Sequence, residues 1–354
     1  MTAVVITGMA AVRPAPLAQR FPDGEAGHPV HRVADFDPVA LFGRRASRYN
    51  HRSTLLAMAA CEAAIAHAGL KIDDDSRDAI GITVGTTVGS VSGTTEFGTD
   101  TFGKRPYLVN AACFPNAVLN AAAGALAIRL GARGPNATIA GGPLACVAAL
   151  RHGEVTLRAG HAETVLAGAS EEVTEPALWW GRGQRDTVAA GEGAAMFVVE
   201  RLETARAAGR APVARLDAVV VRAVDPADPA ALADVIGEAL RLARVEPASV
   251  ELAALRATGV AAVDQAQCNA LRILPAATPL WSEAEIGDCY TAHSGLQLAQ
   301  VIDRLAGGFG HPDGPGGSGE AAGLVIAVDP DGAVGVIAVT RGRTGTSRPF
   351  EEGT

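Results

Sequence analysis

Short apolar runs alternate with helix-like stretches along this chain, and that alternation restricts the folds available to it. Residues 4–12, VVITGMAAV, are typical of a buried strand, and residues 80–84 form a second apolar run. Between them, residues 53–68 place apolar side chains on one helical face and are followed by Gly69, a common helix end. Strands that alternate with helices favour a mostly parallel sheet with helices on both faces. We therefore expect an α/β protein.

The second half of the chain repeats this order of elements. Residues 232–243 carry apolar side chains at helical spacing, and a strand is predicted soon afterwards over residues 252–257. Two further strands, 323–328 and 333–339, flank the turn-forming tetrapeptide DPDG. The repetition predicts two pseudo-duplicated halves of one layered architecture. The predicted division is residues 1–205, residues 206–345 and a frayed tail over residues 346–354.

The composition favours a large buried core and argues against several classes of function. Hydrophobic residues make up 48% of the 354 residues and charged residues 19%, as in compact globular proteins. The net charge of -8 and the lack of Lys and Arg clusters argue against nucleic acid as a partner. No apolar run reaches the roughly 18 residues of a membrane span, and no basic leader precedes the first strand. We expect a cytoplasmic protein that does not bind membranes.

The cysteines and histidines indicate no metal. The five cysteines are scattered without a CxxC spacing, so neither a disulfide framework nor a zinc site is predicted. Residues 13–50 are rich in Pro and Gly and show little periodicity, which indicates a surface excursion rather than core. His28 and His31 lie in this stretch without further ligands, so we expect both at the solvated surface.

Four segments of the chain, in order, resemble the beta-ketoacyl synthase family. They are FDPVALFGRRASRY (residues 36–49), the stretch over residues 115–139, GHAETVLAGASEE (160–172) and AAGEGAAMFVVERLETARAAGR (189–210). The last is the strongest likeness, and we expect its Glu192 to be buried with a partner and to brace the scaffold. The resemblance implies a thiolase-like fold of five layers, αβαβα, in which two pseudo-duplicated halves carry mixed, mostly parallel sheets.

That family presents a catalytic cysteine at a sharp turn between a strand and a helix, where the helix N-terminus stabilises thiolate and oxyanion. Residues 134–150, GPNATIAGGPLACVAAL, retain the strand, the glycine-rich turn and the helix. The position that the resemblance assigns to the cysteine is Pro143. Proline has no nucleophilic side chain, but it suits the first turn of a helix because its missing N–H is not needed there. The resemblance therefore implies a structural role for Pro143.

The family also uses two histidines, which polarise the malonyl thioester and stabilise the enolate. LRATGVAAVD (residues 255–264) resembles the first histidine motif but carries Arg256, and EIGDCYTAHSG (285–295) resembles the second but carries Asp288. Glu283 stands near the position of the family's lysine. The resemblance implies that a Cys-His-His apparatus cannot be assembled. Opposite charges at the two positions could instead form a salt bridge that fills the vacated site.

Loss of all three groups on a retained scaffold resembles the chain-length-factor subunits of type II polyketide synthases. TEPALWW (residues 174–180) and GDCYT (287–291) are similar to segments of those subunits, although glutamine is common there at the position of Pro143. The resemblance implies pairing with an active ketosynthase, as a heterodimer or heterotetramer, and contact with acyl carrier protein and its growing acyl chain. No cofactor is implied, because the condensation uses the carrier-bound thioester alone.

In that family the growing chain runs into a tunnel at the subunit interface, and the silent subunit closes its end. The resemblance places this gate within residues 107–123, where Phe114, Val118, Leu119 and Ala122 could project into the tunnel at helical spacing. The mostly small side chains there would leave room for an extended acyl chain. Ordinary core or dimer packing would explain the same apolar pattern.

Two other functions stay open at this point. One is a self-contained acyltransferase or decarboxylase, for which Cys146 could be a displaced nucleophile and His293 its base if they meet in space; a buried structural thiol is the simpler interpretation of Cys146. The other is a homodimeric pseudo-ketosynthase that binds acyl chains or carrier protein without chemistry.

Overall fold

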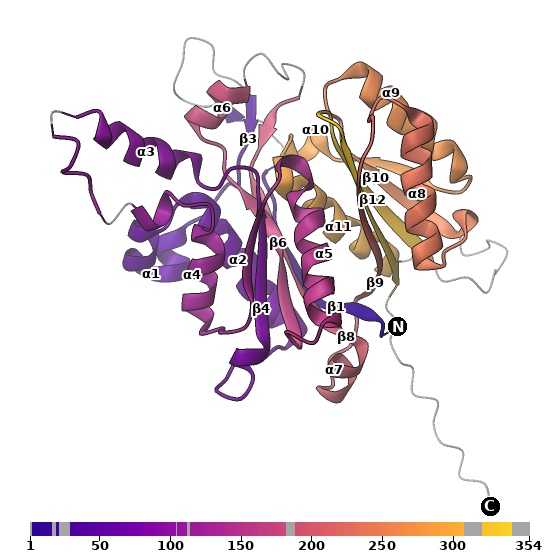
Figure 1. The fold of residues 1–354 in the computed structure, drawn as a ribbon, viewed down its shortest axis with the longest axis horizontal. Helices are drawn as coiled ribbons and strands as arrows, with labels where there is room; N and C mark the ends of the chain where they lie inside the picture. Colours follow the sequence, from indigo (N-terminus) through magenta and orange to yellow (C-terminus); the bar gives the residue numbers. More distant parts are fainter. Residues whose placement is uncertain are drawn as a thin grey trace, which may run out of the picture.

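The computed structural model describes residues 2–15, 19–20, 29–103, 105–111, 114–181, 188–307 and 321–341 (Figure 1). The predicted tail over residues 346–354 and His28 lie outside these ranges. Among the described helices, none is long and apolar enough to cross a membrane.

A ten-stranded mixed sheet, in the order β11-β10-β12-β13-β9-β1-β8-β6-β4-β5, forms the centre of the molecule. Its first-half strands are β1 (Val4–Val12), β4 (Ile80–Thr86), β5 (Asn136–Ala140), β6 (Thr164–Glu171) and β8 (Gly193–Arg201). Its second-half strands are β9 (Ala214–Ala223), β10 (Val250–Leu255), β11 (Thr278–Trp281), β12 (Ala322–Asp329) and β13 (Ala333–Arg341).

The two halves of this sheet have the same strand order. Read from the outer edge of each half-sheet to the centre, the order is the third strand of that half along the chain, then the second, fourth, fifth and first. In each half only the fifth strand is antiparallel to the other four. The first strands of the two halves, β1 and β9, pair antiparallel through Val4 with Leu216 and Ile6 with Ala214. The expected duplication is confirmed, whereas the boundary at residue 205 stays a prediction.

Helices form three layers around the two half-sheets. Helices α2 (Arg52–Ala68) and α4 (Ala121–Leu130) cover the outer face of the first half, and α8 (Pro229–Ala243) and α9 (Ala261–Ala270) lie on the outer side of the second. Between the half-sheets lie α5 (Ala145–Arg158) and α11 (Tyr290–Ala306), which pack on each other and on strands of both halves (Figure 1). This arrangement confirms the five layers.

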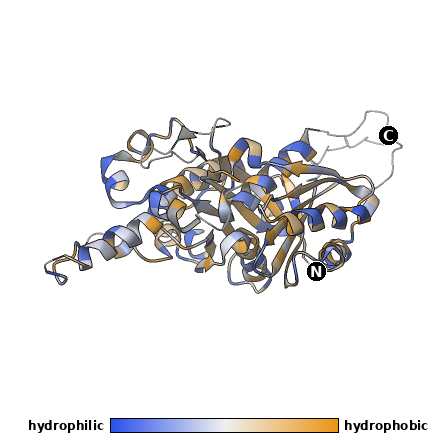
Figure 2. Ribbon diagram, turned by 90° about the horizontal axis from the view of Figure 1, so that it is seen from above, coloured by the Kyte–Doolittle hydropathy of each residue, from blue (hydrophilic) through white to orange (hydrophobic). Residues whose placement is uncertain are grey.

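The predicted elements appear where their apolar faces are buried. Helix α2 buries ten of its residues and ends at Gly69, whose φ of 63° and backbone N–H to Ile65 O close the last turn. In Figure 2 the central strands are mostly hydrophobic in colour, whereas the outer helices alternate hydrophobic and hydrophilic residues. That pattern explains why periodicity predicted these elements.

The N-terminal excursion is more structured than the sequence suggested. Residues Pro38–Tyr49 form helix α1, which begins at an Asp37 cap that accepts hydrogen bonds from Val39 N and Ala40 N. This helix buries no residue completely and is kinked at Gly43, whose φ is 81°, so its short apolar stripe was missed in the Pro- and Gly-rich stretch around it. The expectation for His31 was wrong: it lies in strand β3 (Pro29–His31), is only 5% exposed, and its carbonyl accepts from Glu192 N.

The remaining described elements connect these layers. A small sheet contains β2 (Gln19–Arg20), β3 and β7 (Ala190–Gly191), and the short helices are α6 (Glu175–Gly181), α7 (Leu202–Ala207) and α10 (Glu283–Ile286). Helix α3 (Val91–Thr101) extends away from the sheet as part of an arm (Figure 1).

The segment that was expected to place four gate side chains at helical spacing is not one helix. Phe114 lies in a single 3-10 turn (Phe114–Asn116), and Val118 and Leu119 lie in the turn before α4 begins at Ala121. Only Ala122 is in an α-helix. The helical spacing was therefore wrong, because these residues form turns rather than a buried helical face.

Candidate functional site

Pro143 lies in the turn between β5 and α5, as the sequence predicted. The chain bends at Gly142, whose φ is +56°, and continues through a 3-10 turn (Gly142–Leu144) in which Pro143 and Leu144 are buried. A Cβ at Gly142 would lie 3.4 Å from Asp329 Oδ2, and Cys146 N donates to Thr291 Oγ1 at 2.8 Å. The turn is thus held between the end of β12 and the first turn of α11.

Beside this turn, Arg256 and Asp288 form a buried bidentate ion pair. Arg256 follows β10 and Asp288 precedes α11; Nη2 donates to Oδ2 at 2.6 Å and Nε to Oδ1 at 3.1 Å. Arg256 is 1% exposed and also donates from Nη1 to Val328 O at 3.0 Å. Burial alone would lower the pKa of Arg256, but Asp288 and, more weakly, Glu283 and Asp329 outweigh it and raise that pKa. The suggested salt bridge is confirmed.

The Asp288 loop is bonded to the strand that precedes Glu192. Asp288 N donates to Ala189 O at 2.7 Å, and Gly191 N donates to Asp288 O at 2.8 Å. A Cβ at Gly191 would lie 2.1 Å from Ile286 O, so the close approach of the two segments requires glycine there. These backbone hydrogen bonds link the Asp288 loop of the second half to the first half.

A second buried pair lies next to the first. Glu283 Oε1 accepts from Ala257 N at 2.6 Å and lies 3.1 Å from Nε2 of the fully buried His293. Burial raises the pKa of Glu283, but the hydrogen bond and charge of His293 outweigh it, so that pKa is lowered overall. Glu283 is therefore held close to the His293 ring, whose Nδ1 has no hydrogen-bond partner among the described residues.

Cys146 does not have the surroundings of an activated nucleophile. It is fully buried, and burial raises the pKa of its thiol to about 12, opposed only by a hydrogen bond with Ser294. His293, the suggested base, is paired with Glu283. At neutral pH the thiol stays protonated, which agrees with a buried structural cysteine.

Three buried glutamates lie at the ends of β6 and β7, and the sequence pointed to only one of them. Glu192 is fully buried and accepts from Arg52 Nη2 at 2.6 Å, which confirms its expected bracing role. Glu171 accepts from the backbone N–H of Thr87, and burial raises its pKa to about 8. In the sequence, Glu171 and Glu172 could have been found as two consecutive glutamates directly after the apolar run of β6.

Glu172, the residue after Glu171, accepts hydrogen bonds from residues at the start of two helices. It accepts from Ser53 N at 2.9 Å, from Ser90 Oγ at 3.0 Å and from Ser92 Oγ at 2.6 Å. These bonds fix the start of α2 and the start of α3 against the end of β6, beside the predicted gate segment.

Comparison with known proteins identifies the family. A sequence model described as "Beta-ketoacyl synthase, N-terminal domain" matches residues 15–188. The polyketide beta-ketoacyl synthase 2 of Streptomyces halstedii is 32% identical over 313 residues, which cover 77% of this chain and 72% of that protein. The chain belongs to the beta-ketoacyl synthase family.

Solved structures of ketosynthases share its thiolase-like fold. The ishigamide ketosynthase/chain length factor superposes with a TM-score of 0.80 at 30% identity, over 96% of this chain and 99% of that one. A type II polyketide synthase acyl-carrier protein in complex with its ketosynthase matches with a TM-score of 0.79 at 19% identity, over 96% and 99% of the two chains, which shows the fold alone. Several curated relatives, including 3-oxoacyl-[acyl-carrier-protein] synthase 2 of Synechocystis, are matched over only 48% of their length.

Two of the predicted gate residues of this ketosynthase-family chain line a common pocket. Leu119 and Ala122 form part of its wall, together with residues of α2, β4 and β6. Phe114 instead packs edge to face on Phe97 of α3, with ring centroids 5.7 Å apart, and Val118 is half-buried in the turn.

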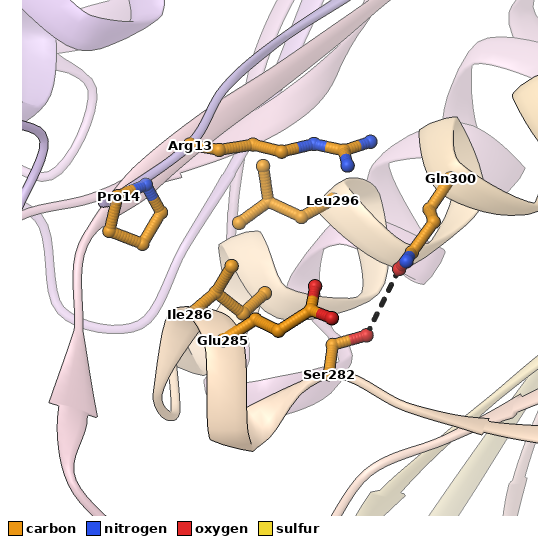
Figure 3. Close-up of a pocket in the computed structure, with 7 residues that line it drawn as sticks. All are labelled: Arg13, Pro14, Ser282, Glu285, Ile286, Leu296 and Gln300. Atoms are coloured by element: carbon orange, nitrogen blue, oxygen red, sulfur yellow. Dashed lines mark hydrogen bonds between the residues drawn. The ribbon is translucent and has the colours of Figure 1, made fainter. Parts of the chain in front are cut away.

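A larger cavity, of about 150 Å³, lies apart from all of these residues (Figure 3). In Figure 3, Arg13 and Glu285 lie on opposite sides of the apolar side chains of Leu296 and Ile286. Its Ser282 hydroxyl donates to Gln300 Oε1 at 3.1 Å. None of the residues that the sequence singled out lines this cavity.

Proposed function

We propose that this chain is a non-catalytic chain-length-factor subunit, which pairs with an active ketosynthase and shapes the tunnel for its acyl chain. The observation that carries the proposal is the buried Arg256–Asp288 pair beside the Pro143 turn. The family resemblance assigns the catalytic cysteine and histidines to these three positions.

The groups at these positions are unsuited to decarboxylative condensation. Proline supplies neither a thiol to attack a thioester nor a backbone N–H to stabilise an oxyanion. Arg256 has a raised pKa and stays charged, so it cannot accept a proton. Asp288 uses both of its carboxylate oxygens on Arg256. No neutral imidazole remains at these positions to hydrogen-bond an enolate.

Two features of the first half are typical of a subunit interface. Strand β5 is an edge of the ten-stranded sheet and is only partly covered, although its neighbour β4 is buried throughout. Near the end of α3, Phe102 is 91% exposed and Tyr107 78% exposed. A partner normally covers an open strand edge, and large exposed apolar side chains are also common where a partner binds.

The partner that we propose is a ketosynthase. The 30% identity with the ishigamide ketosynthase/chain length factor supports this choice, and the structure of a carrier protein with its ketosynthase supports acyl carrier protein as the source of the chain. In the assembled complex, a heterodimer or heterotetramer, Phe114, Val118, Leu119 and Ala122 would contribute to the closed end of the tunnel.

Intact mass spectrometry tests the catalytic assignment. The chain is purified together with its ketosynthase and incubated with an acyl thioester. We expect the mass of the partner to increase by one acyl group while the mass of this chain stays unchanged. A stoichiometric acyl adduct on this chain would contradict the proposal and favour a self-contained acyltransferase.

A further inference from the structure

The cavity in Figure 3 lies between the end of β1, the short helix α10 and the middle of α11, and the proposed function does not use it. Its volume of about 150 Å³ is about five times the roughly 30 Å³ that one water molecule occupies in the liquid. A molecule of a few non-hydrogen atoms fits this space, whereas a long acyl chain or a peptide does not.

The apolar wall of the cavity belongs to the protein core. Leu296 is 1% exposed and packs beside Gly193, where an added Cβ would lie 3.2 Å from the leucine side chain. Ile286 is 7% exposed, and its backbone N–H donates to Ser282 O at 3.0 Å. The Ser282 hydroxyl in turn donates to Oε1 of Gln300, another residue of the lining. These contacts give the cavity a fixed shape.

Two opposite charges line the cavity without pairing with each other. In Figure 3, the Arg13 guanidinium and the Glu285 carboxylate lie on opposite sides of the Leu296 side chain. Arg13 forms an ion pair with Asp303 at a distance of 4.0 Å, and the Asp303 side chain is 64% exposed, so water weakens that pair. The Glu285 carboxylate has no ion pair or hydrogen bond with any described residue. Both charges are therefore available to a ligand.

We propose that this cavity binds a short amino acid that carries its carboxylate and its ammonium group at opposite ends. The carboxylate pairs with Arg13, whose planar guanidinium can donate two hydrogen bonds to one carboxylate. The ammonium group donates to Glu285, and the methylene groups between the two ends lie against Leu296 and Ile286. A simple anion or a simple cation would satisfy only one of the two charges.

Isothermal titration calorimetry on the full chain, purified alone or with its ketosynthase, tests the site with 4-aminobutyrate as the probe. Butyrate lacks the ammonium group and butylamine lacks the carboxylate, so the three ligands separate the contributions of the two charges. We expect 4-aminobutyrate to bind roughly ten-fold more tightly than either of the others, because a hydrogen bond to a charged group changes affinity by about that factor. Glycine, whose two charges are closer together, should bind more weakly than 4-aminobutyrate.

Two substitutions assign the two ends of the ligand to their residues. Glu285→Gln should abolish the preference for 4-aminobutyrate over butyrate, and Arg13→Gln should abolish the preference for 4-aminobutyrate over butylamine. Both residues are exposed, so we expect both variants to fold. Glu203→Gln and Arg206→Gln, on exposed positions of α7 at the opposite end of β1, are the matched controls and should keep both preferences.

Three results would overturn the inference. They are no binding of 4-aminobutyrate at millimolar concentration, equal affinities of the wild type for the three ligands, and preferences that survive in both Arg13→Gln and Glu285→Gln. The titration involves no acyl transfer, so any of these results would leave the proposed function unaffected.

Discussion

At the scale of single residues, Arg256 and Asp288 are both removed from water, so each depends on the other for its charge. Asp288→Ala should destabilise the protein by about 3–5 kcal/mol, because a buried guanidinium is left without its counter-ion. Arg256→Met/Asp288→Leu removes both charges and should cost far less, about 1 kcal/mol or nothing. Urea unfolding of the three proteins checks this. If Asp288→Ala were as stable as the wild type, the two buried charges would not stabilise each other.

Glu171 should make stability depend on pH. Burial raises its pKa to about 8 in the folded protein, whereas a glutamate in an unfolded chain titrates near 4.3. Between these values the folded state retains a proton that the unfolded chain releases, so this group lowers the free energy of unfolding as pH rises, by at most about 1.4 kcal/mol per pH unit.

Glu171→Gln removes the proton-binding group but keeps an oxygen to accept from Thr87 N. Relative to this variant, the wild type should lose about 2 kcal/mol of stability between about pH 5.5 and about pH 7.5, measured by urea unfolding. Glu96→Gln, on the exposed side of α3, serves as the control. Parallel pH profiles for wild type and Glu171→Gln would be inconsistent with a protonated Glu171.

At the scale of elements, the Pro143 turn is shaped for packing rather than for chemistry. Pro143→Cys should fold, because the site is the first turn of a helix, but the new thiol would lie beside the Arg256–Asp288 pair without a histidine base. We expect no acyl adduct on Pro143→Cys by intact mass after incubation with an acyl thioester. A stoichiometric adduct would mean that the scaffold retains an activating environment.

The turn before α4 should influence product length. Ala122→Phe adds a large side chain to the pocket wall, and packed walls deform little, so we expect shorter products from the assembled complex. Ala208→Phe, at the exposed end of α7, should leave product length unchanged. Products of Ala122→Phe identical to those of the wild type, in mass spectra of extracts, would remove Ala122 from the gate.

Elements with a buried apolar face were predictable, and those without one were not. Helices α2 and α8 and strands β12 and β13 were located within a few residues, because each buries a periodic set of side chains. Helix α1 was missed since it buries no residue completely, although Asp37 before Pro38 is a recognisable helix start.

At the scale of the whole molecule, the duplicated layers follow from the order of strands and helices, and the sequence predicted them. The joining of the halves through β1 and β9 depends on which edges meet in space, and no local pattern encodes it. The same limit applies to the site. Opposite charges at Arg256 and Asp288 suggested their pairing, but the pairing of Glu283 with His293 required the packing of α10 against α11 to be known.

We expect the open edge at β5 and the exposed apolar residues near the end of α3 to belong to an interface with a ketosynthase. Co-expression with the ketosynthase encoded beside this chain, followed by size-exclusion chromatography with mass analysis, shows whether the two proteins associate. We predict a stable complex with equal numbers of the two subunits. A stable homodimer that does not bind the ketosynthase would exclude this pairing and indicate a pseudo-enzyme that acts alone.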